Sequence, residues 1–352
     1  MLLTENQPLA PLTTFGIGGP ARWFAQAQSE ADVAEACEWA RVQGLPLFVL
    51  GGGSNVLVSD RGFPGLVLRI GLMGIERDGD LFRVAAGAPW EHCVQQTIES
   101  GYAGLECLAG IPGTVGGTPV QNVGAYGQEV SSVIERVRVF DKQEQRSLEL
   151  SNRDCGFAYR RSRFNSTDRG RFIVTSVDYR LRPGGDPHLA YADLKRHFQN
   201  HSSTPSLSEV AEAVRSVRRR KGMLLVEGDP DCRSAGSFFK NPTVLQETAE
   251  KIHRDAEHGG SPLRTYPGEG GLVKIPAAWL IEQAGFSKGY ALGRAGISSR
   301  HTLALVNRGD GHGDGRGGAT AEEILALAAK IAGAVEAKVG VRLEMEPEMV
   351  GF

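Results

Sequence analysis

Glycines, small hydroxylated residues and amides fill residues 110–129, which hold too few large apolar side chains to build a core. Glycine lets a backbone take positive φ and approach a polyanion closely, so successive N–H groups can bind a diphosphate without a lysine. We expect positive φ at Gly110, Gly113, Gly116 and Gly117. These residue types predict that the segment wraps a phosphate-containing ligand.

A second glycine-rich loop, residues 51–55, repeats this chemistry. It follows an apolar strand predicted at 45–50, so its amides and the Ser54 hydroxyl would meet above a strand end. Two such loops predict a dinucleotide ligand. The alternative, that both loops are tight connections, fits less well, because such a loop needs neither the length of residues 110–129 nor their Gln121–Asn122 amide pair.

Two other glycine patterns match the dinucleotide-binding fingerprint only in their letters. Residues 16–21 contain Pro20 and follow two further prolines, so we expect no strand that leads into a helix there. Residues 313–318 lie between a predicted strand and a helix, but that connection is too long for a Rossmann turn. The 309–318 segment has the composition of a surface loop, in which we expect His312 to be solvated.

Length, composition and charge limit the class of protein. The 352 residues suffice for two or three domains, and a net charge of −2 gives no general basic field for nucleic acid. We find neither a membrane-spanning run nor a signal peptide, and so expect a cytoplasmic protein without membrane insertion. Scattered cysteines give neither a disulfide framework nor a metal pair, so we expect reduced thiols and no metal. The cysteines are Cys37, Cys93, Cys107, Cys155 and Cys232.

One basic run, residues 215–221, ends a predicted amphipathic helix. Cations suit the negative end of a helix dipole, so a solvated helix end is one interpretation. A binding site for an anion is the other, and the sequence leaves both open.

The order of predicted helices and strands divides the chain into three parts. Residues 1–70 are predicted to form a small α/β domain, with a Ser29–Asp32 capping box at its helix. Residues 71–202 are predicted to form an α+β domain, and residues 203–352 a third domain. The predicted helices lie at 30–43, 90–100, 206–219, 244–257, 276–284 and 321–338, and the predicted strands at 45–50, 56–58, 66–70, 81–86, 133–140, 172–180 and 302–306.

Three further clusters are polar where a core would be apolar, at residues 157–162, 234–242 and 343–348. With the two glycine-rich loops and residues 14–17, they resemble the family of UDP-N-acetylenolpyruvoylglucosamine reductases, called MurB. The most specific match is Gly-Ser-Phe-Phe-Lys-Asn-Pro at 236–242.

The resemblance runs from about Thr14 to Glu348 and implies an α+β, three-domain FAD-binding fold of the MurB and vanillyl-alcohol-oxidase type, with a PCMH-like FAD domain. Residues 1–70 and 71–202 would be FAD-binding subdomains, and 203–352 the substrate-binding domain. The implied activity is NADPH-dependent reduction of UDP-N-acetylglucosamine enolpyruvate to UDP-N-acetylmuramate through non-covalent FAD, in bacterial peptidoglycan precursor synthesis. We expect a monomer.

Position by position, the resemblance assigns Arg160 and Glu348 to the region of the substrate carboxylate and Ser237 to proton delivery. Hydride addition to the vinyl carbon leaves negative charge on the neighbouring carbon and its carboxylate, which a fixed guanidinium stabilises. The resulting enolate is basic enough to take a proton from a positioned serine. From the residues alone, Ser237 could equally be a turn residue, Glu348 a surface carboxylate, and either Arg160 or Arg161 the inward arginine.

The resemblance also implies contacts with the substrate and with FAD. Tyr191 would lie in a loop that closes over the substrate, which places the chain in the family branch with such a loop; an ordinary loop tyrosine is the alternative. The expected substrate-binding residues are Tyr191, Lys221, Lys240, Asn241 and Gln283. The expected FAD-binding residues are Gly51, Gly52, Gly53, Ser54, Asn55, Ile111, Pro112, Gly113, Thr114, Gly117, Thr118, Gln121, Asn122, Gly124 and Ala125. The chain departs from the family pattern at Gly52, where glutamate is common, in its last residues, and at 309–318.

Two other functions remain open from the residues. An oxidase of the same flavin fold would pass electrons to dioxygen, but such enzymes often attach flavin through His or Cys, and residues 110–129 contain neither. A non-catalytic nucleotide-binding module would hold its ligand without turnover, so replacing Ser237 would abolish nothing.

Overall fold

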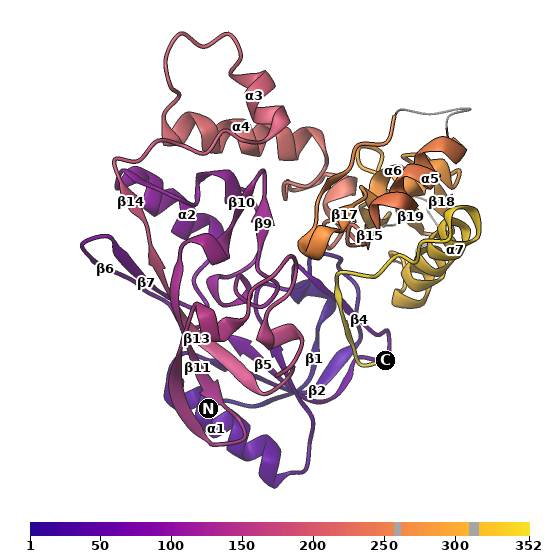
Figure 1. Cartoon of the computed structure of the whole chain (residues 1–352). Coiled ribbons are helices and arrows are strands. Elements are labelled where there is room, and N and C mark those ends of the chain that lie inside the picture. The colour runs from indigo at the N-terminus through magenta and orange to yellow at the C-terminus, as the bar shows by residue number, and fades with distance from the viewer. Residues whose placement is uncertain (257–261, 310–316) are drawn as a thin grey trace. The chain divides into compact units, whose positions relative to one another are not determined.

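The computed structural model describes residues 1–256, 262–309 and 317–352 (Figure 1). Chain contacts divide the protein into two compact units. Unit 1 consists of Met1–Pro8, Pro20–Gly53 and Gly62–Arg220, and unit 2 of Leu9–Gly19, Ser54–Arg61 and Lys221–Phe352. The three-domain division with boundaries after residues 70 and 202 stays a prediction. The expectations for His312 and for residues 310–316 lie outside the described residues.

The first sheet of unit 1 has the strand order β1-β2-β5-β3, in which β2 and β3 run parallel to β5 and β1 is antiparallel to β2. Helix α1 begins at the predicted Ser29–Asp32 capping box, which is confirmed. Our sequence analysis missed β1 and β2 because of the nearby prolines, whereas Pro20 is the first residue of β2, a position that tolerates proline. The bounds are β1 Thr4–Pro8, β2 Pro20–Ala27, α1 Glu30–Val42, β3 Leu47–Leu50 and β5 Phe63–Ile70.

The second sheet of unit 1 is antiparallel throughout, in the order β12-β11-β13-β7-β6. Val137, Val177 and Val84 align across its three middle strands, and all three side chains are fully buried. Branched side chains pack well on such a pleated surface. The three predicted strands of this region are therefore confirmed within one or two residues. The bounds are β6 Ile75–Asp78, β7 Leu81–Ala85, β11 Ile134–Asp141, β12 Arg146–Ser151 and β13 Phe172–Arg180.

Short elements complete unit 1. Two short antiparallel pairs lie outside the two sheets: β8 with the remote β14, and the hairpin of β9 with β10. Helix α4 buries an apolar face that includes Val210, Val214 and Val217. The bounds are α2 Trp90–Glu99, β8 Tyr102–Ala103, β9 Gly124–Ala125, β10 Gln128–Glu129, β14 Arg182–Pro183, α3 Ala192–His197 and α4 Leu207–Arg220.

The described residues of unit 2 form short strands, three α-helices and short 3-10 helices. Residues 56–58 form a strand as predicted, but β4 pairs in parallel with the C-terminal strand β21 and does not complete an N-terminal sheet. The sequence pattern could not show this partner, which lies almost 300 positions away. The bounds are β4 Val56–Val58, β15 Thr243–Val244, α5 Gln246–Ala256, β16 Tyr266–Pro267, β17 Val273–Lys274, α6 Ala277–Gln283, β18 Ala291–Leu292, β19 Ala295–Ile297, β20 Leu305–Asn307, α7 Ala321–Val339 and β21 Glu348–Val350.

Helix α7 packs its apolar face into the core of unit 2. The predicted capping box of Thr320 and Glu323 is present, and Gly340 ends the helix in the left-handed conformation. The Asp60 carboxylate also accepts hydrogen bonds from the N–H groups of Ala321 and Glu322. A carboxylate at this position satisfies helix donors and favours the positive end of the dipole. It also fixes residues 54–61 to unit 2.

Candidate active site

The two glycine-rich loops touch within unit 1. A methyl group on Gly52 would lie 2.6 Å from the Cα of Gly113, and one on Gly51 would lie 2.9 Å from the Thr114 hydroxyl. Only glycine therefore fits at Gly52 without moving backbone. The two loops therefore meet at these residues.

The conformation of the glycine-rich segment 110–129 differs in part from our expectation. Gly110 and Gly113 take positive φ, at 72° and 126°, but Gly116 and Gly117 do not; they lie in a short 3-10 helix, Val115–Gly117. Gly116 is needed for close packing instead, because a methyl group there would lie 2.6 Å from the Ala86 side chain. The expectation for these two glycines was wrong, since a short helix already turns the chain.

Backbone donors at this contact suit a diphosphate. Among the described residues, no group accepts a hydrogen bond from the N–H of Gly52, Gly113 or Thr114. Nothing lies within 4 Å of where a Gly117 side chain would begin. Free amides beside a bare backbone fit the phosphates of FAD, which needs donors and close approach rather than bulky side chains.

Charged side chains hold Gly110, the first residue of the 110–129 segment, in place. The Glu91 carboxylate accepts from the Gly110 N–H at 2.5 Å, and the guanidinium of Arg218 donates to the Gly110 carbonyl at 2.9 Å. Arg215 in turn donates to Glu91 at 2.6 Å. Burial lowers the pKa of Arg218, a cost that nearby Tyr126 and Glu91 offset in part. The basic run at residues 215–221 thus contains buried structural charges, which neither of its two interpretations foresaw.

Asn122 is a buried structural hub in this segment. It takes positive φ, its Nδ2 donates to Glu129 at 2.9 Å and to the Ala158 carbonyl at 3.0 Å, and its Oδ1 accepts from the Ser131 N–H. These contacts bind residues 110–129 to the segment that contains Arg160. A role for Asn122 in contacting FAD stays a prediction.

Arg160 is half-buried against residues 110–129, whereas Arg161 is exposed. The Arg160 Nη2 donates to the Gly124 carbonyl at 2.8 Å, and its φ of 53° is in the left-handed region. Bridge pairing between Ala158 and Arg161 turns the chain sharply there. Of the two arginines, the structure favours Arg160 as the inward one.

Tyr191 lies against the same segment. Its ring meets the ring of Tyr126 edge to face, with 5.3 Å between centroids. Tyr191 directly precedes α3, so it stands at the end of an irregular segment that begins after β14. Tyr191 thus contacts the 110–129 segment through Tyr126, and its role over the substrate stays a prediction.

In unit 2, the chain around Ser237 pairs with the C-terminal segment. Phe239 and Met345 form an antiparallel bridge, in which Lys240 N–H donates to Glu344 and Glu346 N–H to Phe238. This bridge brings the chain around Ser237 beside the segment that leads to Glu348. Backbone hydrogen bonds thus join Phe239 and Met345, which are remote from each other in the sequence.

Glu348 also lies next to Asn55, the last residue of the glycine-rich loop 51–55. Its N–H donates to the Asn55 carbonyl at 2.9 Å, and the Asn55 side chain donates to the Glu346 carbonyl at 3.4 Å. Glu348 is half-buried at the start of β21. Asn55 therefore holds the segment that carries Glu348, and its predicted contact with FAD stays a prediction.

The predicted substrate-binding residues of unit 2 occupy different places. The side-chain Oδ1 of Asn241 accepts from the Ala277 N–H at the start of α6, while Gln283 is the last residue of that helix. The two amides thus lie at opposite ends of α6, about 10 Å apart. Lys240 lies 3.6 Å from Glu344, which is largely exposed. The structure does not group Gln283 with Asn241.

Lys221 belongs to a cluster that our sequence analysis missed. Burial, Lys221 and Lys288 together lower the pKa of His301 to about 4. The His301 Nδ1 accepts from the Leu303 N–H at 3.1 Å, so the neutral ring carries its proton on Nε2. Two lysines beside a neutral donor form a suitable anion-binding cluster. No motif signalled it, because the three residues come from separate segments.

Neither a metal site nor a membrane span emerges in the described ranges. We find no group of three or more His, Cys, Asp or Glu side chains there that could hold a metal ion. None of the described helices has the length and hydropathy needed to cross a bilayer.

Comparisons with known proteins show which protein family this chain is similar to. The model of the UDP-N-acetylenolpyruvoylglucosamine reductase C-terminal domain matches residues 229–350, and the model of an FAD-binding domain matches residues 21–146. The curated reductase of Streptomyces coelicolor is 44% identical over 353 residues, covering 99% of this chain and 90% of the relative. That of Thermobifida fusca is also 44% identical, covering 99% and 98%. The crystal structure of MurB from Thermus caldophilus matches with a TM-score of 0.65 and 27% identity, covering 99% of this chain and 98% of that one.

Fold, loops and comparisons together define an FAD-dependent oxidoreductase with an α+β fold of the predicted FAD-binding class. Residues 21–146, which the FAD model matches, include both glycine-rich loops. Within that class, the chain belongs to the UDP-N-acetylenolpyruvoylglucosamine reductase family.

Proposed function

We propose that the protein reduces UDP-N-acetylglucosamine enolpyruvate to UDP-N-acetylmuramate with NADPH, for peptidoglycan precursor synthesis. Residues of the two glycine-rich loops would hold FAD, which would supply hydride transfer from NADPH to the vinyl carbon of the substrate. The contact of Gly52 with Gly113, with its nearby free amides, supports FAD binding by unit 1. The identity of 44% to named reductases over nearly the whole chain supports the reaction.

Arg160 stabilises the negative charge that hydride addition leaves on the substrate carbon and its carboxylate. Its hydrogen bond to the Gly124 carbonyl holds the guanidinium in place before the reaction. A preorganised charge lowers the barrier more than water does, because it needs no reorganisation when the charge develops.

Ser237 donates the proton that completes the reduction. Its hydroxyl proton goes to the carbon next to the carboxylate, where the enolate carries negative charge. Glu348 orients this serine or returns its proton. The bridge between Phe239 and Met345, which joins the chain around Ser237 to the segment that leads to Glu348, supports this assignment.

We assign the diphosphate of the nucleotide substrate to Lys221, with Lys288 and His301 as additional donors. Lys240 and Asn241 contribute from the segment that also carries Ser237, and Asn241 acts at the N-terminal end of α6. Gln283 remains a proposed substrate contact with less support, since it ends the same helix. Tyr191 closes over the substrate, which places the chain in the branch with a tyrosine loop.

The predicted arrangement of two FAD-binding subdomains, 1–70 and 71–202, and a substrate-binding domain, 203–352, belongs to this proposal. So do a monomeric state and a cytoplasmic location, where NADPH is present. The remaining predicted contacts with FAD, among them Ile111, Pro112, Thr118, Gln121 and Ala125, lie in the range of the matching FAD-binding model.

An anaerobic flavin experiment tests the proposed function. NADPH should bleach the visible flavin colour of the purified protein, and UDP-N-acetylglucosamine enolpyruvate should restore it without oxygen. Colour that returns only in air would favour the oxidase. A protein that binds nucleotide but never bleaches would favour the non-catalytic module.

Replacement of Ser237 separates its role from binding. The Ser237→Ala protein should bleach with NADPH as the wild type does, but recover its colour about 10²–10⁴ times more slowly. Ser203→Ala, at an exposed serine, is the matched control and should recover normally. Equal recovery in both variants would remove Ser237 from the mechanism.

A further inference from the structure

The β9–β10 hairpin ends in a turn that is unfavourable for its sequence. Ala125 pairs with Gln128, so Tyr126 and Gly127 form a two-residue turn with φ of 50° and 86°. Positive φ at both positions defines a type I′ turn, which favours Asn-Gly. A tyrosine in the left-handed region is sterically disfavoured, so contacts of its side chain must hold it there.

Strained residues gather at this hairpin. Five described residues other than glycine have positive φ: Asn6, Asn122, Tyr126, Gln145 and Arg160. Asn122 donates to Glu129 in β10, and Arg160 donates to Gly124 in β9. Three of the five thus belong to one hairpin and its direct partners. Such clustering is typical of functional sites, where the surroundings over-determine an unfavourable backbone.

The Tyr126 ring is the element that touches the neighbouring segment. It is 8% exposed and meets the Tyr191 ring edge to face, 5.3 Å between centroids and 84° between planes. Its hydroxyl interacts with buried Arg218, which donates to the Gly110 carbonyl at 2.9 Å. The Tyr126 side chain therefore contacts both Tyr191 and Arg218, the residue that bonds Gly110.

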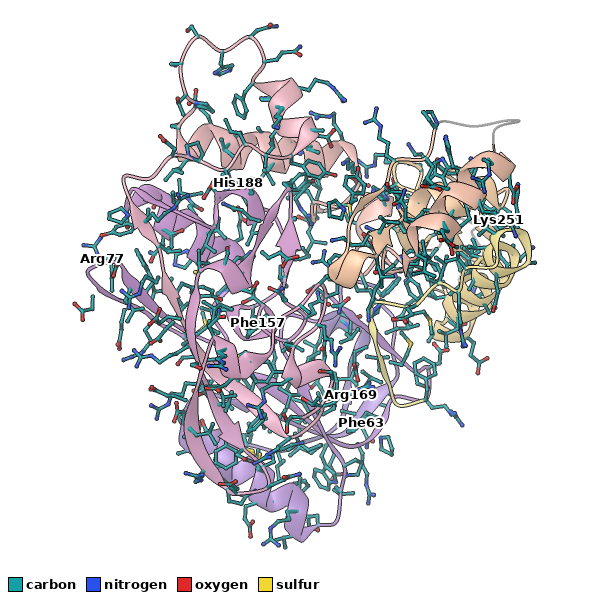
Figure 2. All side chains as sticks on the ribbon, viewed as in Figure 1. Phe63, Arg77, Phe157, Arg169, His188 and Lys251 are labelled. Carbon is teal, nitrogen blue, oxygen red and sulfur yellow. The ribbon has the colours of Figure 1, made fainter. Side chains whose placement is uncertain are left out.

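Gly127, the other residue of the turn, packs against His188 at the start of the segment that carries Tyr191. A methyl group on Gly127 would lie 2.9 Å from the His188 Nε2, so only a glycine leaves room for that ring, which Figure 2 labels. The His188 N–H donates to the Glu106 carboxylate at 2.8 Å, and Cys107 donates to the His188 carbonyl at 3.1 Å. Residues 188–191 are thus held at both ends by the hairpin and its neighbours.

We propose that Tyr126 is a positioning residue that seats the Tyr191 segment for substrate binding. The inference rests on the proposed function, because it takes Tyr191 as a substrate contact. The edge-to-face ring pair holds Tyr191 in place, and Gly127 gives the segment its path past His188. The same hairpin holds Arg160 through Gly124, so one rigid turn sets the positions of two groups that act on the substrate.

A ring deletion that keeps the turn tests the role of Tyr126. Tyr126→Asn suits a type I′ turn and removes the ring, so we expect full FAD content, a KM for UDP-N-acetylglucosamine enolpyruvate about tenfold higher, and kcat within twofold. Tyr191→Ala should raise KM similarly, and the double variant should be no worse than either. Tyr126→Phe, which keeps the ring, should retain the wild-type KM.

A matched pair of glycines gives an independent test. Gly127→Ala and Gly79→Ala both place a side chain at positive φ, but only the first meets another residue, since nothing lies within 4 Å of Gly79. Gly127→Ala should raise KM severalfold, and Gly79→Ala should leave it unchanged. Tyr102→Ala, which breaks an edge-to-face pair with Phe82 elsewhere in unit 1, should also leave KM unchanged.

Limited trypsin cleavage reads the seating of the segment without any turnover. Lys195 and Arg196 are exposed in α3, just after Tyr191. Tyr126→Asn should speed cleavage there about fivefold, and Tyr126→Phe should not. If the wild type fails to reduce the substrate but Tyr126→Asn still speeds trypsin cleavage, the proposed function is wrong. The role of Tyr126 in holding the Tyr191 segment is then still supported. The inference would be overturned if the wild type reduces the substrate but Tyr126→Asn and Gly127→Ala leave both KM and the cleavage rate unchanged.

Discussion

Gly52 and Gly113 lie so close that a methyl group on the first would stand 2.6 Å from the Cα of the second. This contact joins two loops about sixty residues apart in the chain. It also sets the separation of the backbone amides that we assign to FAD. A side chain at Gly52 must push the loops apart.

Gly52→Ala should therefore be isolated with less than about one tenth of the wild-type flavin, because backbone cannot yield as a flexible side chain can. Visible flavin absorbance per protein measures this. The control is Gly333→Ala in α7, where nothing lies within 4 Å; it should keep its flavin and gain up to about 1 kcal/mol of stability. A fully loaded Gly52→Ala protein would show that the loops separate freely.

Arg160 and Arg161 should respond differently to the same conservative change. Arg160→Lys removes the planar guanidinium that bonds Gly124 and should slow reduction of the substrate about 10²-fold or more, with bleaching by NADPH preserved. Arg161→Lys, at an exposed site, should leave both half-reactions unchanged. Stopped-flow absorbance of the flavin distinguishes the two steps. Equal losses in the two variants would contradict the assignment.

Glu106 should be important for stability. It is fully buried and accepts from Gly104 N–H, Gln128 Nε2 and His188 N–H at 2.7–2.8 Å. Glu106→Ala leaves three buried donors unsatisfied and should cost about 3 kcal/mol or more in urea unfolding. Glu99→Ala, exposed in α2, should cost less than about 0.5 kcal/mol. A Glu106→Ala cost as small as that of Glu99→Ala would refute the argument.

Stability should fall in mild acid because of His301. Its pKa of about 4 in the folded protein lies below the ordinary value of 6.5, owing to burial, Lys221 and Lys288. Between these values the unfolded chain binds more protons, so the free energy of unfolding decreases as the pH falls, by about 3 kcal/mol at pH 4. The His301→Asn protein should lose that much less between pH 7 and pH 4 in chemical denaturation. Parallel pH curves for the two proteins would contradict this.

The five cysteines should be unreactive in the folded protein. All are buried, and burial raises the pKa of Cys37 to about 11 and of Cys93 and Cys155 to about 12. Thiolate is the reactive form, so a thiol reagent at pH 8 should titrate all of them only after denaturation. Rapid labelling of a native thiol would indicate local opening.

Sequence patterns predicted those features that depend on neighbouring residues. The capping boxes at Ser29 and Thr320 were predicted correctly, because they involve residues three positions apart. The strands predicted at 133–140 and 172–180 were also correct, because local runs rich in β-branched and aromatic residues favour strands. The prolines, by contrast, led us to miss β2. Whether a strand tolerates a proline depends on its position in the strand, and Pro20 is the first residue of β2.

The candidate site was predictable in its residue types and not in its contacts. Gly116 and Gly117 were expected to take positive φ, whereas the structure uses them in a short helix and in packing. Lys288 and His301 were missed because their separate segments meet only after folding. Asn241 was recognised by its motif, but its hydrogen bond to Ala277 depends on a helix thirty-six residues away.

The sequence by itself determined the family, the two glycine-rich loops and most helix boundaries, because these follow from local composition and short spacings. Only the tertiary structure decided that Gly52 touches Gly113, that Glu348 bonds Asn55, and that the chain at Ser237 pairs with the C-terminal segment. Each of these contacts joins residues far apart in the chain. Their geometry is set by core packing and backbone hydrogen bonding over the whole fold, which no local pattern encodes.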